Sequence, residues 1–181
     1  QHAEVTFDAA VTAAAIVLGD ATDAADDVTT VVFEAQTAAH TITGTINNAK
    51  AADETAIHIT DVTNAAADII TFANDIGNLV PVDAITIGSA TLGGSAVFSG
   101  DVSATAFNIL GGNAAAEDNL GNFKKDLTGA VTLNDATGDA TLKFSGAAAQ
   151  TLTGATIAAS DGEGNIVTAN TGGVVTFGAI G

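Results

Sequence analysis

Acidic side chains within turns are the strongest candidates for chemistry in this sequence. Residues 19–27 read GDATDAADD, and residues 134–139 read NDATGD and keep some of the same groups. Carboxylates grouped with backbone carbonyls can supply the oxygen ligands that Ca²⁺ requires. Neither segment matches an EF-hand loop or the GGxGxD nonapeptide, so a solvated acidic turn is the alternative. Calcium is the one cofactor suggested, with Asp20, Asp23, Asp26, Asp27, Asp135 and Asp139 as its candidate ligands.

Other polar residues form weaker candidates. The pairs Asp53-Glu54 and Asp161-Gly162-Glu163 are short acidic turns, which are common between strands. His40 and His58 fall in strand-like runs, and no Ser and carboxylate are placed around either histidine as a triad would require. Metal binding by this histidine pair is the alternative to ordinary strand positions.

The composition excludes several kinds of chemistry. The chain has no Cys, which removes disulfides, thiolate catalysis and thiolate metal sites. It also has no Trp or Tyr to stack on a sugar, and its GSATLGGS segment (88–95) has no following Lys, as a phosphate loop would need. No catalytic or cofactor-binding residue is assigned, and we expect a protein that is not an enzyme.

The charge balance limits the partners. Lys and Arg together number 4 against 21 Asp and Glu, for a net charge of −17. Phosphate backbones attract clustered positive charge and anionic membrane surfaces repel an acidic chain, so neither is an expected partner. No segment reaches the roughly 18 apolar residues that a membrane span requires, so direct membrane insertion is not expected either. Because 47% of the residues are hydrophobic and the mean hydropathy is +0.38, the chain is expected to fold.

The elements that position these groups are short strands. Thirteen runs alternate branched or aromatic residues with small polar ones and are separated by Gly, Asn and Asp. This pattern predicts an all-β chain, with a short helix or a protruding loop competing at 114–126 and one helical turn at 64–68. The runs are 4–7, 29–33, 40–46, 56–60, 68–72, 83–88, 95–100, 103–110, 129–133, 140–144, 150–157, 165–169 and 173–180.

Seven of the eight phenylalanines lie in these runs and are predicted to form a stacked core. The exception, Phe123, precedes Lys124 and Lys125 in the segment NFKKD. This segment is predicted either to dock on an acidic surface of a neighbouring copy or to form an exposed loop tip.

Comparing the sequence with itself shows a repeat. Residues 33–77 match 144–181, because Phe33 aligns with Phe144, and Thr71-Phe72 aligns with Thr176-Phe177. Such units complete their cores by stacking on neighbours, as in a solenoid. We therefore predict a β-solenoid resembling a β-helix, with tandem β-sandwiches as the alternative. The predicted units are 1–77 and 78–181, with an inserted block near 85–128, or else one continuous domain.

Segments such as SGAAAQTLTGATIAASDGEGNIVTANTGGVVTFGAIG (145–181) resemble repeats of bacterial cell-surface β-proteins. These include autotransporter passengers, rickettsial outer-membrane-protein-B-like antigens and surface-layer proteins. The resemblance implies an extracellular or cell-surface location and a structural or adhesive role, with no catalytic residues.

The leading functional prediction is an extracellular structural protein that self-assembles into a surface layer or filament. Its partner is then a second copy of itself, and Ca²⁺ could bridge the acidic copies. One alternative is an adhesin or passenger segment that presents loops to a host or neighbouring cell. A third, from another class, is a β-helix enzyme that processes polysaccharides.

Overall fold

The computed structural model describes residues 2–19, 28–51, 53–63, 68–111, 119–134, 138–154, 158–159 and 164–180. Within these ranges the chain forms strands and turns and no helix. The strands are β1 (His2–Phe7), β2 (Val11–Leu18), β3 (Val28–Ala35), β4 (His40–Asn48), β5 (Glu54–Asp61), β6 (Ile70–Phe72), β7 (Val82–Ile87), β8 (Ser95–Phe98), β9 (Val102–Leu110), β10 (Asn119–Phe123), β11 (Leu127–Asn134), β12 (Ala140–Phe144), β13 (Gln150–Thr153), β14 (Ala158–Ala159), β15 (Asn165–Thr168) and β16 (Val175–Phe177).

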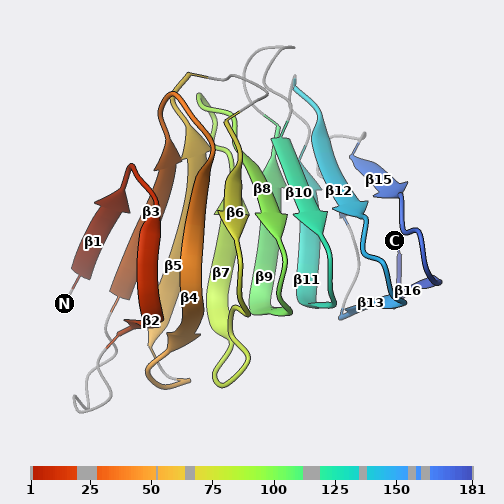
Figure 1. Ribbon diagram of the computed structural model, residues 1–181, viewed down its shortest axis with the longest axis horizontal. Coiled ribbons are helices and arrows are strands. Elements are labelled where there is room, and N and C mark those ends of the chain that lie inside the picture. Colours follow the sequence, from red (N-terminus) through yellow and green to blue (C-terminus); the bar gives the residue numbers. More distant parts are fainter. Residues whose placement is uncertain are drawn as a thin grey trace.

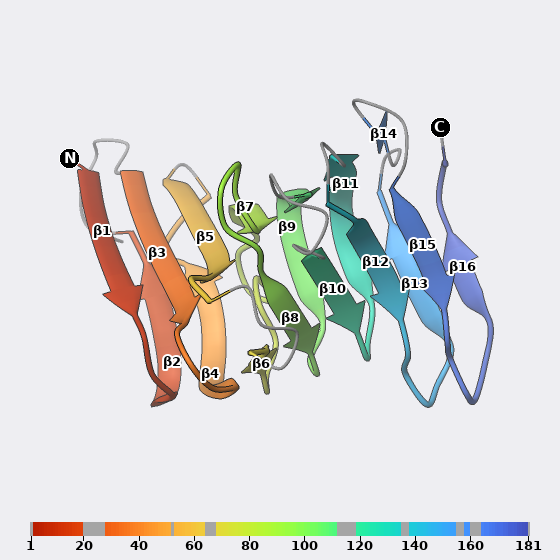
Figure 2. The same ribbon diagram turned by 90° about the horizontal axis from the view of Figure 1, so that it is seen from above.

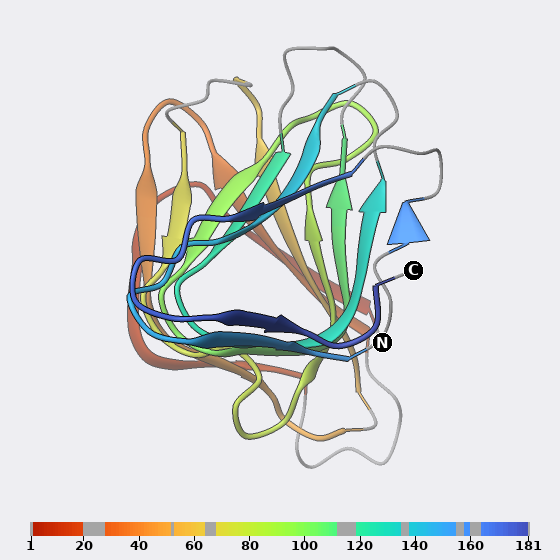
Figure 3. The ribbon, with the colours of Figure 1, turned by 90° about the vertical axis from the view of Figure 1, so that its right-hand side faces the viewer.

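The strands form two sheets in which the paired strands run parallel (Figure 1). One sheet has the order β1-β3-β5-β7-β9-β11-β13-β16, with β14 beside β11, and the other has the order β15-β12-β10-β8-β6-β4-β2. From β1 to β13 successive strands alternate between the sheets, so the chain winds as a solenoid of about 6 turns. Figure 2 shows the coils in a row, and Figure 3 looks along that row. The predicted all-β solenoid is therefore confirmed, whereas tandem sandwiches would require antiparallel sheets.

The core consists of apolar columns that run along the solenoid axis. Every second side chain of a strand points inward, and parallel pairing places it on the equivalent residue of the next coil. One coil takes 26 residues from Phe7 to Phe33 and again from Phe33 to Ile59, and between 21 and 31 residues elsewhere in the solenoid. The column of the larger sheet continues with Ile87, Ile109 and Leu133, and that of the smaller sheet contains Ile42, Phe72, Phe98, Phe123 and Phe144.

Phenylalanine rings fill the centre of this core. The Phe98 and Phe123 rings stack with centroids 4.8 Å apart, and Phe107 meets Phe123 edge-on at 5.2 Å. The side chain of Phe123 is fully buried. The expectation that Phe123 lies outside the strands was therefore wrong, because the residue ends β10 and joins the column.

Each of the thirteen predicted runs overlaps a strand, but β2, β10 and β14 were not predicted. In β10 the sequence NLGNF has low strand propensity, yet β8 and β12 pair with it on both sides. Gly121 fits there because Ile87 and Ile109 occupy the space beside its Cα. Residues 119–126 thus form a strand and a turn instead of a helix, while 112–118 and 64–67 lie outside the described residues.

The two matched segments of the sequence lie half a coil out of phase. Phe33 belongs to the larger sheet and Phe144 to the smaller one, whereas Phe72 belongs to the smaller and Phe177 to the larger. Both sheets need the same inward–outward alternation, so a half-coil shift preserves the pattern. The larger sheet continues across the predicted boundary between residues 77 and 78, because β5 pairs with β7.

Candidate functional site

Most of the predicted calcium ligands lie outside the described residues, namely Asp20, Asp23, Asp26, Asp27 and Asp135. Asp139 is described and exposed, and its backbone carbonyl accepts a 2.7 Å hydrogen bond from the Asn119 N–H. In the ranges that the structure describes, no three His, Asp or Glu side chains are grouped as a metal site. Calcium binding at 20–27 and 135–139 stays a prediction.

The weaker candidates have separate locations. His40 begins β4 in the smaller sheet and is half-buried, whereas His58 lies in β5 of the larger sheet and is exposed. Glu54 is exposed at the start of β5, but the neighbouring Asp53 is buried. Residues 161–163 lie outside the described part of the chain.

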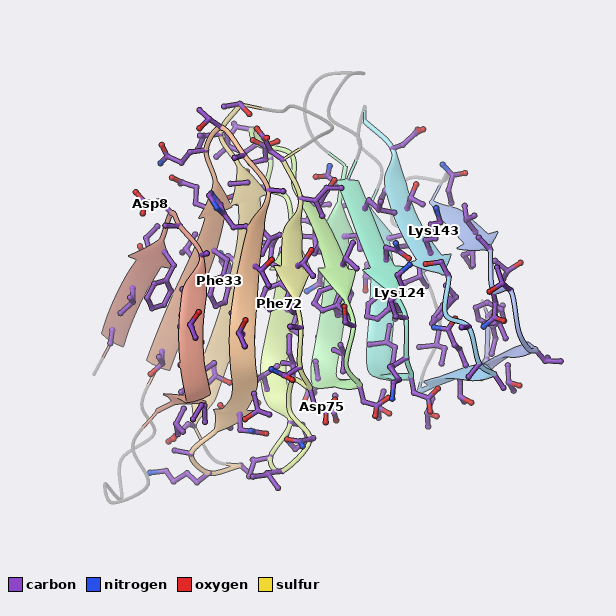
Figure 4. All side chains as sticks on the ribbon, viewed as in Figure 1. Asp8, Phe33, Phe72, Asp75, Lys124 and Lys143 are labelled. Atoms are coloured by element: carbon purple, nitrogen blue, oxygen red, sulfur yellow. The ribbon has the colours of Figure 1, made fainter. Side chains whose placement is uncertain are left out.

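Asp75, Asp101 and Asp126 form an aspartate ladder. They lie in the corner turns that come after β6, β8 and β10. Asp75 Oδ1 accepts a hydrogen bond from the Asp101 backbone N–H (2.9 Å), and Asp101 Oδ1 accepts one from the Asp126 N–H (3.1 Å). Asp126 Oδ1 continues the series by accepting from the Thr151 N–H (2.8 Å). Figure 4 shows Asp75 at the rim of the solenoid, away from the interior Phe33 and Phe72. Each carboxylate therefore ties one coil to the next.

Sequence reasoning missed the aspartate ladder, although a signal was present. Each ladder aspartate directly precedes a buried core residue: Ile76, Val102 or Leu127. The recurrence of Asp before an apolar residue at coil spacing marks a corner position. It could have been found only with the coil length known, because isolated Asp residues are ordinary in turns.

The aspartate ladder allows a test of stability. We expect Asp101→Ala to lower the free energy of unfolding by about 1 kcal/mol, since the Asp126 N–H loses its acceptor at an exposed corner. Asp101→Asn is the matched control, because an amide oxygen can accept the same bond while one of three neighbouring negative charges is removed. Urea unfolding of both variants measures the difference. Equal losses in the two variants would show that the hydrogen bond contributes nothing.

A groove of about 650 Å³ lies beside this ladder. Residues 99–101 and 124–126 form the corner turn in two successive coils, whereas the corner turn of the next coil is the longer segment 145–149. This longer turn forms one wall of the groove, and Ser99, Asp101, Lys124, Lys125 and Asp126 line the remainder.

Lysines give this region its distinctive charge. Lys124 and Lys125 are exposed, and the Lys124 ammonium donates a 2.9 Å hydrogen bond to Ser145 Oγ. Ser145 Oγ in turn donates to Asn122 Oδ1 at 2.6 Å. Lys143, on β12, lies in the next coil (Figure 4). Three of the four lysines thus lie in two neighbouring coils, with aspartates at the same corner.

Gln150 holds the turns around the groove together. Its buried amide Nε2 donates to the carbonyls of Phe123 (3.0 Å) and Lys125 (2.9 Å). Its Oε1 accepts from the Gly146 N–H (2.7 Å) and from the Asn170 side chain (2.9 Å). One glutamine therefore connects the corners of three successive coils, and it leaves the lysine side chains at the surface.

The two end coils are the other unusual surfaces. β1 and β2 are edge strands at one end of the solenoid, and β15 and β16 are edge strands at the other. Among the described residues, six hydrophobic side chains pack on the core while remaining partly exposed, and all six lie in these end strands: Phe7, Val11 and Ile16 at one end, and Ile166, Val175 and Phe177 at the other.

Comparisons with models of protein families, with characterised proteins and with solved structures found no match to this chain. Within the described ranges, no helix has the length and apolarity needed to cross a membrane. The function must therefore be argued from the groove, the aspartate ladder and the end coils.

Proposed function

We propose that this is an extracellular structural protein that self-assembles end to end into a filament or surface layer. The proposal rests on the two end coils. Each of them has edge strands and hydrophobic residues that pack on the core but are only half-buried. An unpaired parallel edge is a template for another strand, and a second copy supplies strands at the same spacing. Cell-surface location rests on the composition and on the resemblance to surface β-proteins.

Charge supports association through the ends rather than the sides. The chain carries −17, so sides that present acidic residues repel each other. Residues 164–180, which form the last coil, contain no charged side chain. Contact between the two different ends is heterologous and leaves a free end on each copy, so association of this kind builds a fibre instead of a closed dimer.

The test compares two valines of equal exposure. Val167 on the edge strand β15 and Val62 after β5 are both 40% exposed. If the ends associate, Val167→Asp places a carboxylate on the edge strand of the smaller sheet, which would pair with β2 of the next copy. We expect it to weaken association about tenfold or more, corresponding to at least ~1.4 kcal/mol, while Val62→Asp associates like the wild-type chain.

Sedimentation velocity over a concentration series, with negative-stain electron microscopy, measures this association. Rods that lengthen with concentration in the wild type and in Val62→Asp, and shorten in Val167→Asp, are the expected result. A wild-type chain that stays monomeric throughout the series, with and without Ca²⁺, would contradict the proposal. Equal weakening by both substitutions would instead indicate association through the sides.

A further inference from the structure

The turn that joins β4 to β5 buries oxygen atoms that have no hydrogen-bond donor. The Asp53 side chain is 0% exposed, and neither of its carboxylate oxygens accepts a hydrogen bond from the described residues. Asn48 Oδ1, at the other end of the same turn, is also buried without a donor. Buried oxygens are nearly always satisfied, so such a group calls for water or an ion.

Neighbouring contacts determine which atoms remain unsatisfied. Asn48 Nδ2 donates to the Pro81 carbonyl (3.0 Å) and approaches Asp83 Oδ2 (3.4 Å), and these two acceptors orient the amide. The amide oxygen of Asn48, Oδ1, is therefore the atom that has no hydrogen-bond donor. Asp83 Oδ2 also accepts from Thr55, through its N–H at 2.8 Å and its hydroxyl at 3.1 Å. The donors of Thr55 thus go to Asp83 and not to Asp53.

Lys50 is the positive group beside Asp53. Its ammonium lies 3.3 Å from Asp53 Oδ1, and the lysine side chain is 25% exposed. A buried carboxylate is stabilised only when its charge is paired and its remaining lone pairs are satisfied. The lysine approaches one carboxylate oxygen and leaves the other, so the turn still offers oxygen ligands of the kind that hard cations prefer.

Described residues on either side of the predicted acidic run, residues 20–27, contact this same turn. Before it, Gly19 packs directly against Asp53 Oδ2, and the Ala49 N–H donates to the Leu18 carbonyl at 2.7 Å. After it, Val28 pairs with Glu54. The run itself lies outside the described residues.

We propose that the buried oxygens of Asp53 and Asn48 bind Ca²⁺ at this turn, with Lys50 as the partner of Asp53 when the ion is absent. The proposal is independent of self-assembly, because the turn belongs to the second and third coils rather than to an end. It predicts competition: Ca²⁺ and the Lys50 ammonium neutralise the same carboxylate.

The experiment uses the full chain freed of metal by a chelator, with calorimetric titration of CaCl₂ and thermal unfolding with CaCl₂ or EDTA. The wild-type protein is expected to bind Ca²⁺ and to melt at a higher temperature in its presence. Asp53→Asn is expected to weaken binding about tenfold or more. Asp139→Asn tests the other predicted acidic turn, and Asp8→Asn, which changes an exposed aspartate outside both acidic turns, is the control that should bind like the wild type.

Lys50→Gln provides the sharper test and does not depend on the stability of the Asp53 variant. It should melt lower than the wild type in EDTA, recover in CaCl₂, and bind Ca²⁺ more tightly. If Ca²⁺ neither binds nor raises the melting temperature of the wild type or Lys50→Gln, Lys50 alone neutralises Asp53 and the proposal is overturned. Binding that survives Asp53→Asn but is lost in Asp139→Asn would place the site at the other acidic turn and also overturn it.

Discussion

Replacing Phe123 with alanine is expected to lower the free energy of unfolding by about 3–5 kcal/mol, the range for truncating a buried phenylalanine. The Phe123 ring is fully buried and contacts the rings of Phe98, Phe107 and Phe144, with centroids 4.8, 5.2 and 5.6 Å away. Its coil has neighbours on both sides, so the cavity left by truncation cannot collapse without breaking strand pairing. The loss is measured by urea unfolding followed by far-ultraviolet circular dichroism.

Phe7→Ala is the matched control for this prediction. The change in side chain is the same, but Phe7 lies in the first coil, is only half-buried and stacks on a single ring, Phe33, at 5.6 Å. We expect a loss below about 2 kcal/mol, measured at a concentration where the chain is monomeric. Similar losses for Phe7 and Phe123 would contradict the placement of Phe123 in the interior column.

Gly129→Ala is expected to destabilise the fold by about 2–4 kcal/mol, from backbone strain together with steric overlap. Gly129 has φ of 145°, a conformation that residues with a side chain rarely adopt. A Cβ atom there would overlap the Ala104 carbonyl of the preceding coil. The same urea experiment measures the effect, and the register shift between Thr128 and Ala130 shows why the strand needs a glycine at this bend.

Thr128→Ala is the control for Gly129. Thr128 is the adjacent residue on β11 and is exposed, so its truncation should change the free energy of unfolding by less than about 0.5 kcal/mol. A Gly129→Ala variant as stable as Thr128→Ala would mean that the strand adjusts to accept a side chain. The tight approach of the two coils would then not be required by the fold.

Local pattern predicted most strands because strand alternation has a period of two wherever the strand lies. β10 was not predicted from this alternation, because its residues are small and polar apart from Leu120 and Phe123. The pairing that stabilises it comes from β8 and β12, which are distant in sequence and cannot be read from β10 itself. Interactions of this kind also created the aspartate ladder, whose members lie a full coil apart.

Candidate sites were harder to predict than strands. The sequence indicated acidic turns as places for a cation, and Asp53 was among the weaker candidates. Its burial, the unsatisfied oxygen of Asn48 and the approach of Gly19 depend on how two successive coils stack. Likewise, Gln150 shows no motif, since its partners are backbone groups of the neighbouring coils.

The sequence alone determined that the chain is all-β, acidic and built of repeated short strands, because composition and period-two alternation are local properties. Only the tertiary structure decided which sheet each strand joins, since both sheets require the same alternation and a half-coil shift preserves it. It also decided that Phe123 is buried while Lys124 and Lys125 stay exposed. The reason is physical: the length of each turn sets where a coil closes, and closure determines which side chains meet.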